Sequence, residues 1–374
     1  MSLRIAGTGW VTPLGRGVDP VWQRLLEGDE ARAEQITDRF SDQQYNVFRV
    51  PETALTGLPP HSRLRRASPI SRFAVAAGLD ALEQLKLNPE TAKRIALVFA
   101  ISNGGVIYTK RFYHDIVESG AQSASPLLFP ETVFNAPASH LAAILGITGA
   151  TYTVIGDGAV GVLAIKMAED LMANEDLDYC LVVGAEEIDW LLCDAYRKWR
   201  LLRLEPPVEP FSKVAHGMIL SEGAGAVLLG RDNGAIAIEK IDPGGHYQHR
   251  SELEPLLKRL VADLASDKID IAITSANGTF IDKAESNALS KITDVLVYST
   301  KPAMGESVGA VGLWQTIVAA KALLEAELPP LLHSSSATPL GVPKSRTKLT
   351  EPIRAIVLSC GMNQQVAGLR LIKA

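Results

Sequence analysis

The feature that most restricts the fold of this chain is a regular alternation of short apolar runs with longer, helix-like segments. Two of these runs, residues 95–100 and 179–183, are almost wholly apolar and are followed closely by glycine. Strands of this kind, separated by helix-length segments, are typical of β-α-β units whose strands are covered on both faces. The sequence therefore predicts an α/β fold. We expect strands at residues 4–6, 95–100, 152–155, 179–183, 235–241, 269–274, 295–298, 353–358 and 367–372, two close-packed strands within 218–230, and helices at 159–172, 253–264, 282–289 and 308–324.

Further helix starts are marked by a polar residue followed by proline. Such pairs stand at residues 19–20, 68–69 and 88–89. A capping side chain and a proline at the first helical position are typical of a helix N-terminus. Residues 73–79, in the second of these helices, are apolar nearly all round, so we expect that helix to be buried.

The alternation begins again after the polar turn at residues 231–234. A chain of 374 residues is long enough for about two domains. The sequence therefore predicts two halves of similar kind, residues 1–232 and 233–374.

Composition excludes several classes of function. With 37 lysines and arginines against 42 aspartates and glutamates the net charge is −5, which disfavours nucleic acid and anionic membranes as partners. The sequence has no apolar run of the roughly 18 residues that a spanning helix needs, and its start lacks the pattern of a signal peptide. The cysteines Cys180, Cys193 and Cys360 lack metal-like spacing. We expect a cytoplasmic protein without metal or cofactor.

Several blocks of sequence occur in an order that matches a known family. The first is GTGWVTPLG at residues 7–15, followed by FNAPASHLAAILG at 134–146 and GATYTVIGDGA at 149–159. Further blocks lie at residues 209–225, which end in SEGAG, and at 299–310, STKPAMGESVGA. In these blocks the chain resembles the β-ketoacyl-acyl-carrier-protein synthases of the thiolase superfamily, over nearly its whole length.

The resemblance implies a fold and an assembly. The fold is thiolase-like, a five-layered α-β-α-β-α duplication with two mostly parallel mixed sheets. The assembly is a dimer whose interface lies around residues 134–146 and 149–159.

The resemblance also implies where catalytic side chains should stand. The family uses a cysteine at a helix N-terminus, where the thiolate is favoured, and two histidines that donate hydrogen bonds to developing negative charge. The cysteine position matches Gly158, and the histidine positions match Asn277 and Glu306. Only Lys301 and Glu285 match the family among the central polar residues. Of two threonines that would contact a pantetheine arm, one is Thr279 and the other position is Ile281, and the glycine-rich gate loop is replaced by residues 359–365.

Two interpretations are open for Asp157, for the pair of Glu306 and Lys301, and for Cys360. Asp157 is either a substitute nucleophile or base, or a cap of the following helix, and we favour the cap. Glu306 and Lys301 form either a catalytic acid–base pair or a buried ion pair, and we favour the ion pair. Cys360 is either a reactive thiol or a small buried hydrophobe, and we favour the second.

Other candidates concern a chain tunnel or a subunit interface. Tyr108 and Phe112 stand at helical spacing beyond Gly104 and Gly105, in a region that borders the acyl tunnel of the family. Ordinary packing is the alternative for these aromatic side chains. The tunnel and interface candidates are Asn103, Tyr108, Phe112, Phe134, Asn135 and Met362.

Taken together, the matches and departures predict a non-catalytic subunit of the chain-length-factor type. It would form a heterodimer with an active ketosynthase, shape the chain tunnel, and meet an acyl carrier protein only indirectly. Known chain-length factors of aromatic polyketide systems usually carry glutamine where this chain has Gly158, so we prefer the aryl polyene type. The alternatives are a divergent acyltransferase or hydrolase with another nucleophile, and a homodimeric scaffold protein.

Overall fold

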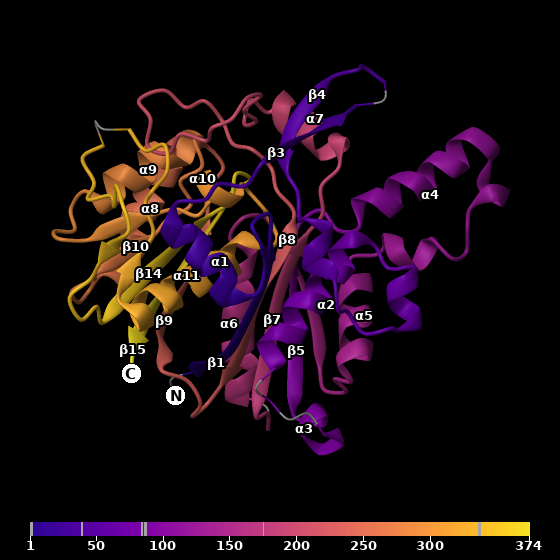
Figure 1. Cartoon of the computed structure of the whole chain (residues 1–374), viewed down its shortest axis with the longest axis horizontal. Coiled ribbons are helices and arrows are strands. Elements are labelled where there is room, and N and C mark those ends of the chain that lie inside the picture. Colours follow the sequence, from indigo (N-terminus) through magenta and orange to yellow (C-terminus); the bar gives the residue numbers. More distant parts are fainter. Residues whose placement is uncertain (1–2, 39, 84, 86–87, 175, 336–337) are drawn as a thin grey trace.

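The strands of the computed structural model form a sheet of two matching halves (Figure 1). The structure describes residues 3–38, 40–83, 85, 88–174, 176–335 and 338–374. In the N-terminal half the strand order is β1-β8-β7-β5-β6, and in the C-terminal half it is β9-β15-β14-β10-β11. The strands are β1 (Leu3–Thr12), β5 (Ile95–Ile101), β6 (Thr151–Ile155), β7 (Tyr179–Glu186), β8 (Gly223–Gly230), β9 (Ile236–His246), β10 (Ile271–Ile273), β11 (Leu296–Tyr298), β14 (Arg354–Cys360) and β15 (Gln365–Lys373).

The two halves agree in strand direction as well as in order. In the N-terminal half β5 lies between β7 and β6 and is parallel to both. In the C-terminal half β10 lies in the same way between β14 and β11. The remaining strand pairs of each half are antiparallel. The halves join where β1 pairs with β9, with Leu3 opposite Ile238 and Arg4 opposite Ala237. This repeated arrangement confirms the predicted thiolase-like duplication, with the halves continuous through β1 and β9 and with antiparallel pairs next to this junction.

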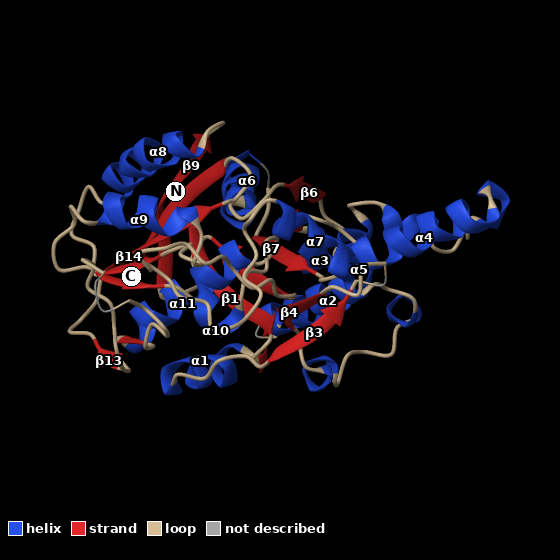
Figure 2. Cartoon of the chain, turned by 90° about the horizontal axis from the view of Figure 1, so that it is seen from above, coloured by secondary structure: helices blue, strands red, loops and turns tan. Residues whose placement is uncertain are grey.

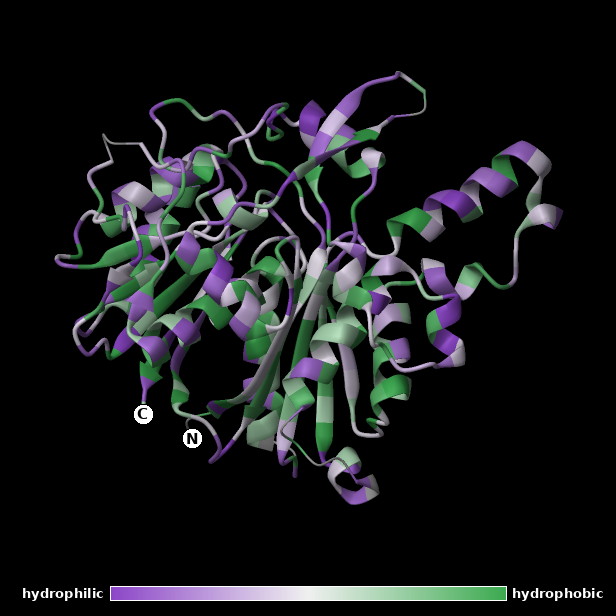
Figure 3. Cartoon of the chain, viewed as in Figure 1, coloured by the Kyte–Doolittle hydropathy of each residue, from purple (hydrophilic) through white to green (hydrophobic). Residues whose placement is uncertain are grey.

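Helices cover the sheet in layers. Helices α2 (Pro69–Leu82) and α5 (Ala136–Leu145) cover the outer face of the N-terminal half, and α8 (Arg250–Leu264) with α9 (Phe280–Leu289) covers the outer face of the other half. Between the halves lie α6 (Val160–Asn174) and α11 (Val311–Glu325), which contact strands of both. Hydrophobic residues concentrate on these strands and central helices (Figure 3).

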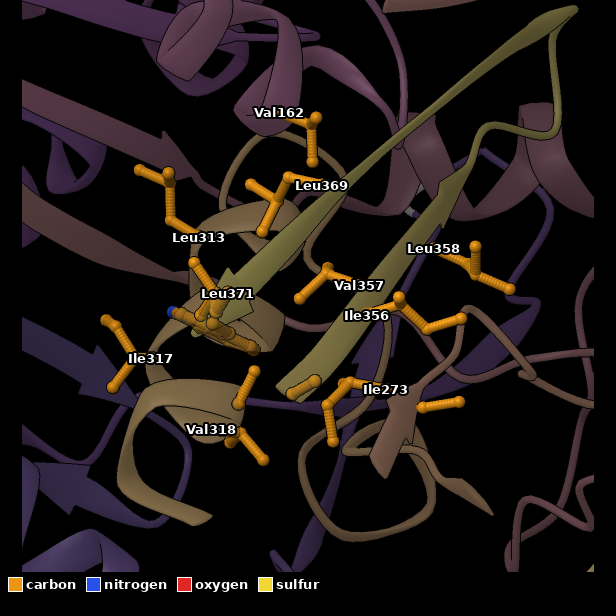
Figure 4. Packing of buried hydrophobic residues seen from close by; sticks show 14 of the residues in the cluster. Val162, Ile273, Leu313, Ile317, Val318, Ile356, Val357, Leu358, Leu369 and Leu371 are labelled. Atoms are coloured by element: carbon orange, nitrogen blue, oxygen red, sulfur yellow. The ribbon is translucent and has the colours of Figure 1, made fainter. Parts of the chain in front are cut away.

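The core between α11 and the C-terminal strands is closely packed. Leu313, Ile317 and Val318 of α11 lie against the side chains of β14 and β15, among them Val357 and Leu369 (Figure 4). All five side chains have no exposed surface. Burial of this kind stabilises the fold by about 1.5–3 kcal/mol for each large apolar side chain.

Helices α6 and α11 approach each other very closely at one point. A β-carbon at Gly161 would lie 3.1 Å from the α-carbon of Gly312, and one at Gly312 would lie 3.2 Å from the α-carbon of Gly161. Both glycines stand in the first turn of their helix. The two helix N-termini are therefore held together at the centre of the molecule.

One helix extends from the body of the protein. Helix α4 (Val106–Ser119) projects to one side in two perpendicular views (Figures 1 and 2). The smaller elements are α1 (Val18–Glu27), α3 (Pro89–Lys93), α7 (Trp190–Lys198), α10 (Lys301–Met304), the short strand β2 (Gly15–Arg16), the pair β3 (Ala33–Thr37) and β4 (Gln44–Phe48), and the pair β12 (Glu327–Leu328) and β13 (Thr347–Lys348).

The prediction of two strands within residues 218–230 is wrong. Only β8 forms there, and the preceding residues make single bridges to separate segments, Met218 to Leu202, Ser221 to Phe48 and Leu220 to Glu306. The apolar run is buried because it crosses the interior, and an apolar run alone does not distinguish a strand from a buried connection.

Candidate functional site

The candidate site lies where turns from both halves meet the N-terminus of α6. Gly158 stands just before α6, Asn277 follows β10, and Glu306 lies between α10 and α11. The turn from β14 to β15, which carries Cys360 and Met362, lies against these residues. The structure therefore brings Gly158, Asn277, Glu306, Lys301 and Met362 together from distant parts of the sequence.

Gly158 is packed against the backbone of that turn. A β-carbon at Gly158 would lie 2.8 Å from the carbonyl oxygen of Cys360 and 3.1 Å from the α-carbon of Gly361. The Ser359 hydroxyl donates a hydrogen bond of 2.8 Å to the carbonyl oxygen of Gly158. Backbone atoms therefore occupy the space into which a side chain at residue 158 would extend.

A buried ion pair forms the centre of the site. Lys301 Nζ lies 2.6 Å from Glu306 Oε2, and each side chain is only 1% exposed. The amide of Asn277 donates a hydrogen bond of 2.8 Å to the same Glu306 oxygen. The Asn277 carbonyl oxygen accepts hydrogen bonds from the hydroxyl and the backbone N–H of Thr279. Our prediction of a buried Lys301–Glu306 pair is confirmed by this geometry.

More carboxyl groups surround this one lysine. Burial raises the pKa of Glu285 to about 8, although a hydrogen bond from the Ser275 N–H and the charge of Lys301 favour the ionised form. Asp282 accepts hydrogen bonds from the backbone N–H groups of Phe211, Asn277 and Gly278, yet burial raises its pKa to about 6. The site therefore holds an excess of acidic groups over cations.

Asp157 links the N-terminus of α6 to the β14–β15 turn. Its Oδ2 accepts a hydrogen bond of 2.7 Å from the backbone N–H of Asn363, and its own N–H donates to Gln365. Burial raises the pKa of Asp157 to about 7, against hydrogen bonds from the backbone of Asn363 and Ala159, and the charge of Glu306 raises it further. The contact with Ala159 agrees with a capping role for Asp157.

Cys360 has the character of a core residue. Its side chain is 1% exposed, and its sulfur lies 3.7 Å from Glu285 Oε1. Burial raises the pKa of the thiol well above its usual value. A buried, protonated thiol is a poor nucleophile. The geometry therefore favours the interpretation of Cys360 as a small buried hydrophobe.

A small pocket opens beside the site. It has a volume of about 270 Å³ and is lined by Asp157, Tyr196, Trp199, Leu201, Arg250, Met362 and Asn363. The sulfur of Met362 lies 3.9 Å from the amide nitrogen of Asn277, so this side chain separates the pocket from the ion pair. Burial raises the pKa of Tyr196, and a hydrogen bond to the side chain of Asn103 acts in the opposite direction. Asn103 therefore lies next to the pocket.

The remaining tunnel and interface candidates lie on or beside the projecting helix. Phe112 is 9% exposed and packs against Tyr113 and Phe129, with ring centroids 5.7 and 5.8 Å apart. Phe134 is 41% exposed, and Asn135 next to it is exposed at the start of α5. Together with the half-buried Tyr108 of α4, these residues are not part of the pocket lining. Their role in a tunnel or an interface stays a prediction.

Sequence reasoning missed five of the seven residues that line the pocket, namely Tyr196, Trp199, Leu201, Arg250 and Asn363. Tyr196 and Trp199 belong to the unpredicted helix α7 and its end, and their rings pack edge to face at 5.4 Å. Asn363 contributes a backbone N–H, which carries no signal in its side chain. Two signals in the sequence point to a helix there, the aromatic spacing at 196 and 199 and the N-cap residue Asp189, whose side chain accepts a hydrogen bond from the Leu191 N–H.

Two general features of the described residues bear on function. No helix among them is both long and apolar enough to cross a membrane. Within the same residues, no group of three or more histidine, cysteine, aspartate or glutamate side chains is arranged to hold a metal ion.

Comparison with protein-family models gives a match along most of the chain. Residues 2–235 match the model for the N-terminal domain of β-ketoacyl synthases, and residues 235–335 match the model for the C-terminal domain. The chain belongs to the β-ketoacyl synthase family. Among its curated relatives is 3-oxoacyl-[acyl-carrier-protein] synthase 2 of Staphylococcus aureus, 23% identical over 90% of this chain and 91% of the relative. The enzyme of the same name from Vibrio cholerae is 25% identical over 88% and 87%.

Solved structures show the same β-ketoacyl synthase fold. The ishigamide ketosynthase/chain length factor matches with a TM-score of 0.89 and 20% identity, over 100% of this chain and 99% of that one. A ketosynthase (ApeO) in complex with its chain length factor (ApeC), from Xenorhabdus doucetiae, matches with a TM-score of 0.83 and 18% identity, over 100% and 98%.

Proposed function

We propose that this chain is a non-catalytic subunit of the chain-length-factor type, which pairs with an active β-ketoacyl synthase. In this proposal Gly158, Asn277 and Glu306 stand at the positions where active members carry cysteine and two histidines. A glycine cannot form a thioester, and an ionised carboxylate would repel the enolate that histidines stabilise. Retained fold and lost chemistry together favour a role as a partner.

The single observation that carries this proposal is the packing at Gly158. The β14–β15 turn fills the space of a side chain at residue 158, with the Cys360 carbonyl oxygen 2.8 Å from where a β-carbon would be. The nearby Glu306 is held by Lys301 and Asn277 in a closed, buried cluster. Backbone atoms and a buried cluster therefore stand where, in this proposal, an active member would need room for its nucleophile.

An unpaired strand edge supports the role as a partner. Strand β6 pairs with β5 on one side and stands at the end of the sheet, and its Tyr152 and Ile155 are 39% and 54% exposed. The opposite edge is covered, because Leu296 and Val297 of β11 contact Gly341. An exposed, apolar edge strand is a site for pairing with another chain, and we propose that the ketosynthase adds its own edge here.

Within this role we propose a heterodimer in the cytoplasm that meets an acyl carrier protein through its ketosynthase partner. Asn103, Tyr108, Phe112, Phe134, Asn135 and Met362 are the proposed tunnel and interface residues. Two neighbours in structure are described as pairs of a ketosynthase and a chain length factor, which agrees with such an assembly. Among two-subunit ketosynthases we propose the aryl polyene type, since Gly158 replaces the usual glutamine of aromatic polyketide systems.

Co-expression with a ketosynthase that retains cysteine and both histidines tests the proposal. We expect the two chains to co-purify as a one-to-one complex by light scattering, and the complex to elongate acyl chains. The isolated chain should be inactive with malonyl- and acyl-carrier substrates. Condensation by the isolated chain, or a stable homodimer that does not bind the ketosynthase, would refute the proposal.

A further inference from the structure

A second pocket, separate from the pocket beside the site, lies next to the start of α2. It has a volume of about 420 Å³ and is lined by Leu55, Leu58, Pro59, Pro60, His61, Leu64, Arg65 and Arg72. This volume falls within the range of about 300–1,000 Å³ that is typical of ligand-binding pockets. The pocket is therefore large enough for a small organic molecule.

The larger part of the pocket wall is apolar and firmly held. It consists of the leucine and proline side chains of residues 55, 58, 59, 60 and 64. Leu64 is buried, and Leu55 and Leu58 pack against the hydrophobic core of the N-terminal half. The prolines restrict their own backbone, since the ring fixes φ at about −65°. An apolar group bound here would leave water without first having to order its binding site.

The polar part of the wall is cationic. Its residues are His61, Arg65 and Arg72, and no acidic side chain lines the pocket. Arg65 is exposed and Arg72 is half-buried. Neither arginine takes part in an ion pair within the described ranges of the chain, and the buried Nε of Arg72 has no hydrogen-bond partner there. The pocket thus carries positive charge that no carboxylate of these residues neutralises.

The imidazole of His61 adds a hydrogen-bond donor to this wall. Its Nδ1 accepts a hydrogen bond of 3.2 Å from the backbone N–H of Arg63 and so caps the single-turn helix Ser62–Arg65. Because Nδ1 is the acceptor, the proton of the neutral ring is on Nε2, which can donate.

Apolar and cationic surface adjoin in this pocket, since Leu64 and Arg65 are neighbours in the chain. A guanidinium group binds carboxylate and phosphate oxygens through charge-assisted hydrogen bonds. We propose that this pocket binds a small amphipathic anion. Its apolar tail lies against the leucine and proline side chains, and its carboxylate or phosphate head lies at the exposed Arg65, where the charge of Arg72 adds to the attraction.

This inference is independent of the proposed role as a ketosynthase partner. Calorimetric titration of the full chain compares hexanoate and hexyl phosphate with neutral hexanol and cationic hexylamine, which have the same tail. We expect one or both anions to bind about tenfold more tightly than hexanol, because only they form a charge-assisted contact. Hexylamine should bind most weakly of the four. Acetate, which lacks the tail, should bind about tenfold more weakly than hexanoate or worse.

Variants separate the charge of the pocket from its apolar wall. The double variant Arg65→Gln with Arg72→Gln should lower the affinity of the anion to that of hexanol, and Arg65→Gln alone, at an exposed residue, should give part of this loss. Leu58→Asn should weaken the anion and hexanol alike, since both tails contact the same wall. Arg63→Gln is the matched control, because Arg63 is an exposed arginine of the same helical turn that does not line the pocket. Thermal unfolding of each variant confirms that it folds.

Three results would overturn the inference. These are the absence of binding by both anions, equal affinity of the anions and hexanol, and an anion affinity that Arg65→Gln and the double variant leave unchanged. Co-purification with a ketosynthase is measured separately, so failure here leaves the proposed function unaffected.

Discussion

The buried ion pair gives the sharpest prediction. Lys301→Met replaces the ammonium group by an apolar end of similar length, and leaves Glu306 as a carboxylate that is 1% exposed and has no other ion pair within the described residues. Removing one partner of a buried pair costs about 3–5 kcal/mol of unfolding free energy. Glu306→Gln should cost less, because Glu285 also interacts with the charge of Lys301. The double variant Lys301→Met with Glu306→Gln should recover part of the loss, since it leaves no uncompensated charge.

Urea unfolding followed by tryptophan fluorescence measures these differences, because Trp314 and Trp22 are fully buried in the core. The wild type, the two single variants and the double variant form a double-mutant cycle, which gives the interaction free energy between the side chains of residues 301 and 306. The reasoning is refuted if Lys301→Met costs less than about 1 kcal/mol, or if the double variant loses the full sum of the single losses.

Three further predictions concern the surrounding residues. Gly158→Cys should leave condensation of malonyl and acyl groups undetectable and lower the unfolding free energy by about 1–3 kcal/mol, because its β-carbon meets the Cys360 carbonyl oxygen; activity from this single change would contradict the role assigned to the turn. The pKa of Asp157 is raised from 3.8 to about 7, so the folded chain holds a proton that the unfolded chain releases, and stability should fall as the pH rises from 3.8 to about 7. That fall should be smaller in Asp157→Asn when denaturation is compared at the two ends of this range, and an identical fall would count against the raised pKa. Ile155→Asp on the edge of β6 should prevent co-purification with a ketosynthase, whereas Val214→Asp, at an exposed residue elsewhere, should not; complex formation by Ile155→Asp would exclude this edge as the interface.

The sequence predicted the regular elements well where local chemistry decides them. Gly28 marked the end of α1 and Pro69 the start of α2, and the all-round apolar residues of α2 predicted its burial. The predicted start of α1 is wrong, because the helix begins at Val18, so Asp19 lies within its first turn and is not the cap. The run at 218–230 failed because its first part crosses the interior with single bridges, a tertiary effect that no local pattern records.

The site divides in the same way. The pairing of Lys301 with Glu306 followed from opposite charges in one predicted block. The packing of the β14–β15 turn over Gly158 could not be predicted in this way. It depends on the positions of backbone atoms of Cys360 and Gly361, which the side chains of these residues do not determine. Likewise, the pocket that Asp157 and Arg250 both line depends on how the two halves are packed.

The close contact of Gly161 with Gly312 has an electrostatic consequence. Each helix N-terminus carries a partial positive charge of about half an elementary unit. Here the N-termini of α6 and α11 lie next to each other. The scaffold thus keeps a fixed field there that side-chain replacement does not remove. Negatively charged groups are favoured by such a field, and a carboxyl group lies beside each helix start: Asp157 precedes α6, and Glu186 accepts a hydrogen bond of 3.1 Å from the Gly309 N–H just before α11.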